Sequence, residues 1–357
     1  ENLGLVVKVL TGSTKSSDRK ILLNDLKNGS INLLIGTHAI FEQNVIFNNL
    51  GYAVIDEQHR FGVKQRSKIW EKNNPPPHVL IMTATPIPRT LTMSLYGDLD
   101  LSIIDELPPG RKDVITVHRK DKNRLKVFGF IRDQIKQGRQ IYIVYPLIEE
   151  SKKMDLKYLE DGLESITREF DKENYSIGVM HGRMRSSNKD IEMNNFLNGK
   201  IDILISTTVI EVGVNVPNAS VMIIENAERF GLSQLHQLRG RVGRGKYDSY
   251  CVLMTNDKIS EDAKIRIDAM VNSNDGFKIS EVDLRLRGPG DVLGTKQSGV
   301  LDFKIADIIE DESILFSVSN EADLLIKKDP KLNLNENYNI RSFILNNPIN
   351  KSWNEIG

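Results

Sequence analysis

Residues 187–207 read SNKDIEMNNFLNGKIDILIST, and this stretch decides the fold. Ser187 can cap a helix that carries Ile191 on its apolar face and ends near Gly199. The run that begins at Ile203 is apolar and β-branched until its last two residues, as a buried parallel strand would be. A helix followed directly by such a strand predicts a crossover unit of a parallel α/β sheet.

The same alternation extends along most of the chain. A second helix of this kind is predicted from Ser17, which can cap it, to Gly29. The predicted strands turn polar in their last residues; they span 33–36, 52–56 and 79–84 in a first series and 141–146, 177–181, 203–207, 221–225 and 250–254 in a second. Two series of strands indicate two parallel-sheet domains, and beyond these two halves we find no repeat of fixed period.

Proline and glycine separate the two series of strands. The segment Glu106–Arg111 reads ELPPGR and can continue neither a helix nor a strand, so we place a domain boundary there. From Asp275 onward the alternation stops, and an Asn-rich tail follows from Asn333. The predicted divisions are a first domain at 1–108, a second domain at 109–272 and a peripheral C-terminal region at 273–357.

The composition excludes a disordered chain and a membrane protein. Hydrophobic residues make up 39% and charged residues 27%, which is typical of a globular protein. The longest apolar run, 141–148, contains Pro146 and is far shorter than the roughly 18 residues that cross a bilayer. The 48 basic and 48 acidic residues cancel, so any polyanion has to be bound by local patches. The single cysteine, Cys251, is predicted to be a buried thiol, and we expect a cytoplasmic protein.

Two adjacent acids follow the predicted strand that begins at residue 52. Ligands of parallel sheets bind at the carboxyl ends of the strands, and Asp56-Glu57-Gln58-His59 stands at such an end. In a nucleoside triphosphatase, Asp56 could hold a hydrated Mg²⁺ while Glu57 orients the attacking water. Two acids in a strand-to-helix turn, capping the next helix, would show the same pattern. Alone, the motif fits both interpretations.

Hydroxyl residues mark two further strand ends. Thr83 and Thr85 follow one strand of the first series, and Thr207 and Thr208 end one strand of the second. Hydroxyls at these places suit contacts with phosphate, although ordinary turns also use them.

An arginine-rich and glycine-rich run lies between 237 and 245. Arg241 and Arg244 are three residues apart, so on a helix both would point to one face and could reach triphosphate oxygens. Taken alone, such a run is more often a nucleic-acid patch or a solvated face.

The order and spacing of these segments resemble the superfamily 2 helicases over the first 255 residues. The similarity is greatest to the RecG branch, the branched-DNA translocases, in blocks at 56–62, 83–90, 96–100, 104–111, 180–184 and 225–237. A further block at 283–299 resembles the motif that follows the second domain in RecG and in the transcription-repair coupling translocases. In those proteins it couples ATP hydrolysis to movement along duplex DNA.

The resemblance implies a role for each matching residue. With ATP as the nucleotide, Asp56 would hold Mg²⁺ and Glu57 would activate water. The other residues implied to act in catalysis are Gln58, His59, Gln237, Arg241 and Arg244. The residues implied to couple hydrolysis to movement are Thr83, Thr85, Arg285, Arg287 and Gln297. The residues implied to contact the DNA backbone are Thr11, Gly12, Ser13, Gly36, Thr37, His38, Thr207 and Thr208.

The resemblance also implies two RecA-like parallel-sheet domains, the first incomplete, and a C-terminal helical or irregular appendage. The sequence contains no GxxxxGK[ST] loop to cradle phosphates, and we expect that it does not include the wedge domain that precedes the motor in RecG proteins. We therefore expect most of the motor of an ATP-dependent DNA helicase that remodels stalled forks and Holliday junctions in recombination and repair. The parent protein is expected to act as a monomer on branched or duplex DNA, and this chain alone to be inactive.

Two alternatives stay open. A transcription-repair coupling translocase shares the motor and the terminal motif, although Gln58 and the blocks at 226–228 and 284–287 favour RecG. A truncated chain that binds DNA or a partner without turnover is the non-enzymatic alternative. An RNA helicase is less favoured, because the terminal motif accompanies translocation on duplex DNA.

Overall fold

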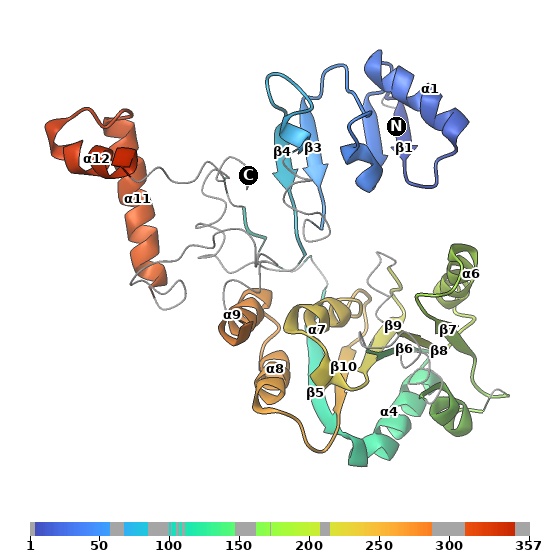
Figure 1. Cartoon of the computed structure of the whole chain (residues 1–357). Coiled ribbons are helices and arrows are strands. Elements are labelled where there is room, and N and C mark those ends of the chain that lie inside the picture. The colour runs from blue at the N-terminus through green and yellow to red at the C-terminus, as the bar shows by residue number, and fades with distance from the viewer. Residues whose placement is uncertain are drawn as a thin grey trace. The chain divides into compact units, whose positions relative to one another are not determined.

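The computed structural model describes residues 4–57, 68–84, 100, 102–104, 106, 108, 111–146, 162–171, 173–207, 215–287 and 311–346 (Figure 1). The chain forms two compact units, here called unit 1 (1–84, 89–102 and 303–357) and unit 2 (85–88 and 103–302). In the part of the chain that the structure describes, no helix is long and apolar enough to span a membrane.

Unit 2 is built on a six-stranded sheet in which every strand pair is parallel. Its strands, in the order in which they pair, are β5 (Val114–Lys120), β10 (Ser249–Thr255), β9 (Ala219–Ile224), β6 (Gln140–Tyr145), β8 (Ile203–Thr207) and β7 (Ile177–Met180). Every residue of β6, β8 and β9 is buried, as the continuous apolar runs predict for strands covered on both faces.

Helices cover both faces of this sheet. Tyr142 and Val144 belong to a core that also holds Phe196, while Ile141 and Ile143 point to the other face. The helices that contribute to the first core are α6 (Ser186–Leu197), α7 (Leu232–Arg239), α8 (Glu261–Asn272) and α9 (Gly276–Arg287). The second core is formed with α4 (Arg124–Lys136), which follows the 3-10 turn η3 (Asp121–Asn123), and with the helical segment 162–169. A parallel α/β fold with crossover helices is therefore confirmed.

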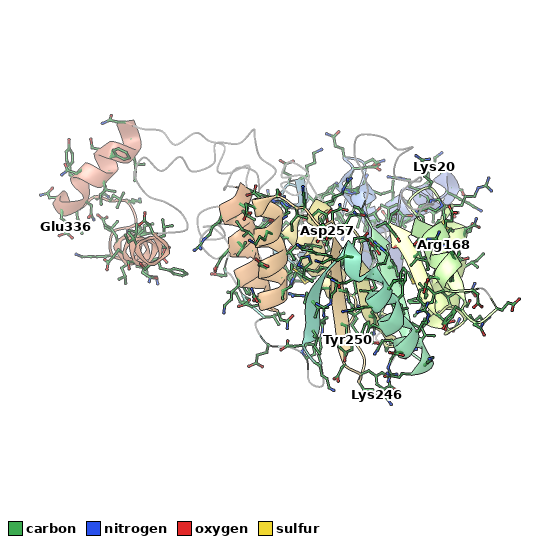
Figure 2. The ribbon with its side chains drawn as sticks, turned by 90° about the horizontal axis from the view of Figure 1, so that it is seen from below. Lys20, Arg168, Lys246, Tyr250, Asp257 and Glu336 are labelled. Atoms are coloured by element: carbon green, nitrogen blue, oxygen red, sulfur yellow. The ribbon has the colours of Figure 1, made fainter. Side chains whose placement is uncertain are left out.

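All strands of this sheet run in the same direction, which β10 illustrates. Figure 2 shows Lys246 in the turn before β10 and Asp257 beyond its other end, with Tyr250 on the strand between them.

Cys251, on the same strand, is fully buried, and burial raises the pKa of its thiol to about 12, so it is the structural thiol that the sequence predicts.

Unit 1 contains two smaller parallel sheets. The pairs are β1 (Val7–Leu10) with β2 (Leu33–Gly36) and β3 (Tyr52–Ile55) with β4 (His78–Ile81). The other elements are α1 (Ser16–Lys27), η1 (His38–Phe41), α11 (Glu312–Lys328), η6 (Asn335–Asn337) and α12 (Tyr338–Asn346). The last three form the helical C-terminal region that was expected.

One βαβ segment of unit 1 is repeated in unit 2 at a constant offset of 170 residues, from Val7 to Ile177 and from Gly36 to Ser206. The ladder registers are the same, since Val7 faces Leu33 and Ile177 faces Ile203. This repeat relates the two halves that the sequence predicts, and the sequence expectation concerned only repeats beyond them. The repeat is easy to overlook because its shared residues are scattered over strands, turns and a helix.

The repeat extends to individual hydrogen bonds. The helix in each copy ends in an Asn-Gly pair, Asn28-Gly29 or Asn198-Gly199, in which the glycine has a left-handed φ of 77° or 70°. In both copies this asparagine N–H donates to the carbonyl oxygen four residues earlier at 3.0 Å. The same contacts stabilise the same turn in both units.

The two predicted caps of these helices are wrong. The helices begin at Ser16 and Ser186, and the capping positions are held by Lys15 and Arg185, with φ and ψ close to −60° and 145°. Neither cap residue makes a side-chain capping bond. Each helix therefore begins one residue before the serine that was predicted as its cap. The reason is that the last non-helical residue, which has an extended backbone, is Lys15 in one copy and Arg185 in the other.

Comparison of the units identifies a strand position that differs. In unit 2, β6 lies between β8 and β9, whereas the residues described in unit 1 supply no strand between the equivalent β2 and β3. Val9, Ile35 and Val54 of unit 1 are accordingly 52–57% exposed, while the strands that flank β6 are buried. Within its described residues, unit 1 is an incomplete counterpart of the sheet in unit 2, as expected.

Candidate functional site

The acidic pair lies where β3 ends. Asp56 directly follows the buried Ile55, its side chain is exposed, and its Oδ1 accepts the backbone N–H of Glu57 at 2.8 Å. Glu57 has a left-handed φ of 51°, a conformation that non-glycine residues rarely adopt. Asn226, at the exit of the equivalent strand β9, has φ 49°. This sharp exit turns the chain away from the sheet and exposes the Asp56 carboxylate.

The structure brings Thr83 to the same edge. Ile55 and Ile81 are ladder partners, and Met82 donates its N–H to the carbonyl of Ile55 at 2.8 Å. Thr83 therefore follows β4 beside the position where Asp56 follows β3. The other predicted residues of these segments, Gln58, His59 and Thr85, lie outside the described residues.

The predicted DNA-contacting residues of unit 1 also gather at one edge. Leu10 pairs with Gly36, so the turns that follow β1 and β2 are adjacent. In the first turn, the Thr11 hydroxyl lies 2.9 Å from that of Ser13, and Gly12 is open to solvent. The second turn begins with residues that are all exposed: Gly36, Thr37 and His38. Two exposed turns with hydroxyl and N–H groups can contact successive phosphates.

Gly36 is required by close packing. A side-chain carbon at this position would overlap the Leu10 carbonyl oxygen and the Ile40 side chain. Because of this close approach, the Thr37 N–H can donate to the same Leu10 oxygen at 3.3 Å. The glycine therefore keeps the two turns together.

In unit 2, Thr207 is the last residue of β8. At the offset of 170 it corresponds to Thr37, which directly follows β2 in unit 1. The Thr207 side chain is buried, and its Oγ1 has no hydrogen-bond partner among the described residues. Thr208 lies outside the described residues.

The arginine-rich run does not form a helix. Helix α7 ends at Arg239 with Gly240 as its cap, and Gly243 has a left-handed φ of 77°. Arg241 and Arg244 therefore lie in the turns before β10, and the prediction that helical spacing aligns them is wrong. Gln237 lies in the last turn of α7 and is partly buried.

A buried arginine fixes the end of α7. Arg239 is 3% exposed and donates through Nη1 to the carbonyl oxygens of Met270 and Ser273 at 2.9 and 2.7 Å. These carbonyls lie at the C-terminal end of α8, where the helix dipole favours a cation. Its Nη2 lies 3.1 Å from Nδ1 of His236. The arginine thus joins α7 to α8 and holds the following turns in place.

His236 makes this region sensitive to acid. Burial and the neighbouring Arg239 lower the pKa of His236 to about 4, although Asp275 acts in the opposite direction. Unfolding returns the pKa to about 6.5, so the unfolded chain binds a proton that the folded chain rejects as the pH falls from 6.5 to 4. Acidification from pH 7 to pH 5 is expected to lower the stability of unit 2 by about 2 kcal/mol through this group.

The measurement is urea unfolding followed by circular dichroism at pH 7 and pH 5, on the native chain and on His236→Gln. The variant should lose that part of the acid sensitivity and retain what His118 contributes, since burial also lowers the pKa of His118. An equal loss of stability in both proteins would show that His236 is not responsible.

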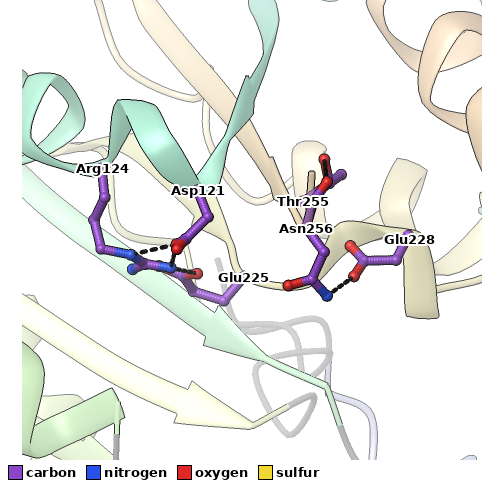
Figure 3. A network of polar contacts seen from close by, with 6 residues as sticks. All are labelled: Asp121, Arg124, Glu225, Glu228, Thr255 and Asn256. Carbon is purple, nitrogen blue, oxygen red and sulfur yellow. Dashed lines mark hydrogen bonds and ion pairs between the residues drawn. The ribbon is translucent and has the colours of Figure 1, made fainter. Parts of the chain in front are cut away.

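An ion pair between a buried carboxylate and a partly exposed arginine lies at the exit of β9. Arg124 donates through both Nη atoms to Glu225 at 2.7 and 2.9 Å, and it also contacts Asp121 at 2.7 Å (Figure 3). Burial lowers the pKa of Arg124, but the hydrogen bonds and charge of Glu225 raise it more, so the net shift is upward. In the same figure, Asn256 donates to Glu228 at 2.6 Å. Glu225 directly follows β9, as Asp56 directly follows β3 in unit 1.

Comparison with known proteins identifies the family. The chain is 52% identical over 339 residues to the ATP-dependent DNA helicase RecG of Synechocystis sp., covering 95% of this chain and 40% of that protein. It is 48% identical over 329 residues to the RecG of Bacillus subtilis, covering 92% and 48%. The family model described as "ATP-dependent DNA helicase RecG, domain 3, C-terminal" matches residues 273–347. This chain belongs to the RecG family.

Other comparisons agree with this assignment. The models "DEAD/DEAH box helicase" and "Helicase conserved C-terminal domain" match residues 1–94 and 123–246 of this RecG-family chain. A solved structure of RecG bound to a three-way DNA junction shares 44% identity with a TM-score of 0.64, covering 87% of this chain and 40% of that one. The helicase Lhr of Mycobacterium smegmatis, at 16% identity and a TM-score of 0.54, covers 76% and 37% and shows the fold alone. The chain spans less than half the length of the two curated relatives above.

The region matched by the RecG-specific family model begins with α9. In the last turn of α9, Arg287 pairs with Asp283 through Nε at 3.0 Å, and its guanidinium also approaches Gly231 at the start of α7. Arg287 thus holds α9 against α7. Arg285 is exposed, and Gln297 lies outside the described residues.

Sequence reasoning included 180–184 among the RecG-like blocks but assigned no role to its residues. At the offset of 170, the turn Thr11-Gly12-Ser13 corresponds to His181-Gly182-Arg183. The carbonyl of Gly182 accepts a hydrogen bond from Lys189 at 3.0 Å, and Nδ1 of His181 is buried without a hydrogen-bond partner in the described part of the chain. An alignment of the chain with itself would have identified this turn.

Proposed function

We propose that this chain is the motor portion of an ATP-dependent DNA translocase that remodels stalled forks and Holliday junctions in recombination and repair. The observation that carries the proposal is the 44% identity to a RecG structure bound to a three-way junction. The proposed divisions, a first motor domain at 1–108, a second at 109–272 and a C-terminal region at 273–357, are supported by the ranges of the family matches.

ATP is the proposed substrate, with Mg²⁺ as its cation. No cluster of three metal-binding side chains occurs in the described residues, and this fits a Mg²⁺ that takes most of its ligands from water and phosphates. The exposed Asp56 carboxylate would hold the hydrated ion, which would neutralise phosphate charge, and Glu57 would orient the attacking water. Gln58 and His59 are proposed to act with this pair, and Gln237, Arg241 and Arg244 to contact the triphosphate.

Both units are proposed to contact the DNA backbone. Unit 1 would use its paired turns at 11–13 and 36–38, and unit 2 would use Thr207, Thr208 and the turn at 181–183. These groups address phosphates rather than bases, so binding would weaken steeply with salt and depend little on sequence. Thr83, Thr85, Arg285, Arg287 and Gln297 are proposed to couple hydrolysis to movement. We further propose that the protein acts as a monomer in the cytoplasm, where its DNA substrate is found.

The test is ATP hydrolysis by the full-length parent on three DNAs of equal length: a three-way junction, a linear duplex and a single strand. We expect the junction to stimulate hydrolysis most, and Asp56→Asn to remove the stimulation while leaving DNA binding intact. Equal stimulation by linear duplex would contradict a branch-specific motor. A requirement for RNA polymerase would indicate a transcription-repair coupling translocase instead.

A further inference from the structure

A third arginine approaches the turn that carries Arg241 and Arg244. Arg111 lies just before β5, and its Nη2 is 3.5 Å from the carbonyl oxygen of Gly240. The same oxygen accepts a hydrogen bond from Nε of Arg244 at 3.1 Å. Two guanidinium groups from segments far apart in the sequence therefore meet at one backbone oxygen.

The backbone fixes this approach. A side-chain carbon built at Gly243 would stand 2.9 Å from Cγ2 of Val114 and 3.5 Å from the carbonyl oxygen of Lys112. The segment that follows Arg111 thus runs in contact with the turns that carry Arg241 and Arg244. This packing therefore sets the position of the backbone at Arg111.

Two arginines at this place lack an acidic partner within the described part of the chain. No ion pair of Arg111 or Arg244 is found there, and the nearby Asp248 pairs with Lys112 at 2.7 Å. Burial, Arg241 and Arg111 each lower the pKa of Arg244, which means that its positive charge is disfavoured. One neutral carbonyl oxygen does not offset this repulsion, whereas a bound polyanion would.

We propose that Arg111 is a third arginine of a triphosphate-binding site in unit 2 and contacts the phosphates of the nucleotide together with Arg241 and Arg244. This inference rests on the proposed function, because ATP is the ligand that the function supplies. A planar guanidinium can bind two phosphate oxygens at once, so each of the three arginines can hold a different part of the triphosphate.

The experiment compares Arg111→Gln with Arg119→Gln in the full-length parent. Arg119 is a matched control, because it lies at the other end of β5, is exposed and also donates to a backbone carbonyl, that of His118 at 2.8 Å. We expect Arg111→Gln to raise the KM for ATP about tenfold through loss of a charge-assisted contact. Arg119→Gln should leave the KM within about twofold of the native value. Equal KM values in the two variants would overturn the proposal.

Thermal unfolding separates ligand binding from a structural role. If Arg111 binds phosphate, Arg111→Gln keeps or raises the Tm of the nucleotide-free protein, because like-charge repulsion is relieved, and it reduces the rise in Tm caused by inorganic triphosphate. A lower Tm with an undiminished rise would show that Arg111 only fastens the chain. A native parent without ATP hydrolysis would overturn the proposed function, and the response to inorganic triphosphate would still decide the role of Arg111.

Discussion

Replacing Arg241 by glutamine in the full-length parent is expected to lower kcat for DNA-stimulated ATP hydrolysis by about a thousandfold. An arginine that reaches the transferring phosphoryl group offsets charge that grows in the transition state, so its loss affects the rate more than nucleotide binding. Arg241 lies beyond the end of α7 in a turn whose shape depends on Gly243 and on the buried Arg239.

The measurement is steady-state ATP hydrolysis on a saturating three-way junction, with kcat and KM determined separately. Arg241→Lys should restore little of the rate, since an ammonium cannot bind two oxygens in the plane of a guanidinium. Arg139→Gln is the control, because Arg139 stacks on the ring of Tyr247, 3.1 Å from its centroid, in the same unit. A loss of kcat below about tenfold would remove Arg241 from the proposed catalytic group.

Replacing Glu225 by alanine is expected to destabilise unit 2 by about 2–3 kcal/mol, because it leaves the Arg124 guanidinium, which is 30% exposed, without its main partner. The Glu225 side chain is 4% exposed and accepts two hydrogen bonds from one guanidinium. The remaining partner, Asp121, is 57% exposed, so water screens its charge and it cannot replace the lost carboxylate.

Hydrogen exchange of the peptide that covers β6 measures this loss, since a fully buried central strand exchanges only when the unit unfolds. Asp121→Ala is the matched control and should cost about 0–1 kcal/mol, because it removes an exposed partner of the same arginine. Similar losses in the two variants would mean that burial does not decide the strength of this ion pair.

Eight of the ten described strands could be predicted from the sequence as apolar runs, whereas β1 and β5 were not predicted. The run that begins at Ile203 matches β8 in full, and the acidic pair and hydroxyls lie at strand ends as expected. A strand inside a parallel sheet is recognisable from its own residues, since it must be apolar on both faces.

The polar contacts could not be predicted, because they join residues that are far apart in the chain. Glu225 is buried against an arginine 101 residues away, and Arg239 is held by carbonyls more than 30 residues away. The helical spacing assigned to Arg241 and Arg244 failed for a related reason. The packing of Gly243 against Val114 sets the path of that turn, and the spacing of residues in the sequence does not indicate such a contact.

The duplicated βαβ segment bears on how such a motor can originate. The sugar-phosphate backbone presents the same chemical group at every nucleotide, so a protein that must hold it at two places can use one solution twice. The left-handed turns at Gly29 and Gly199 have the same geometry in both copies, even where the residues around them differ.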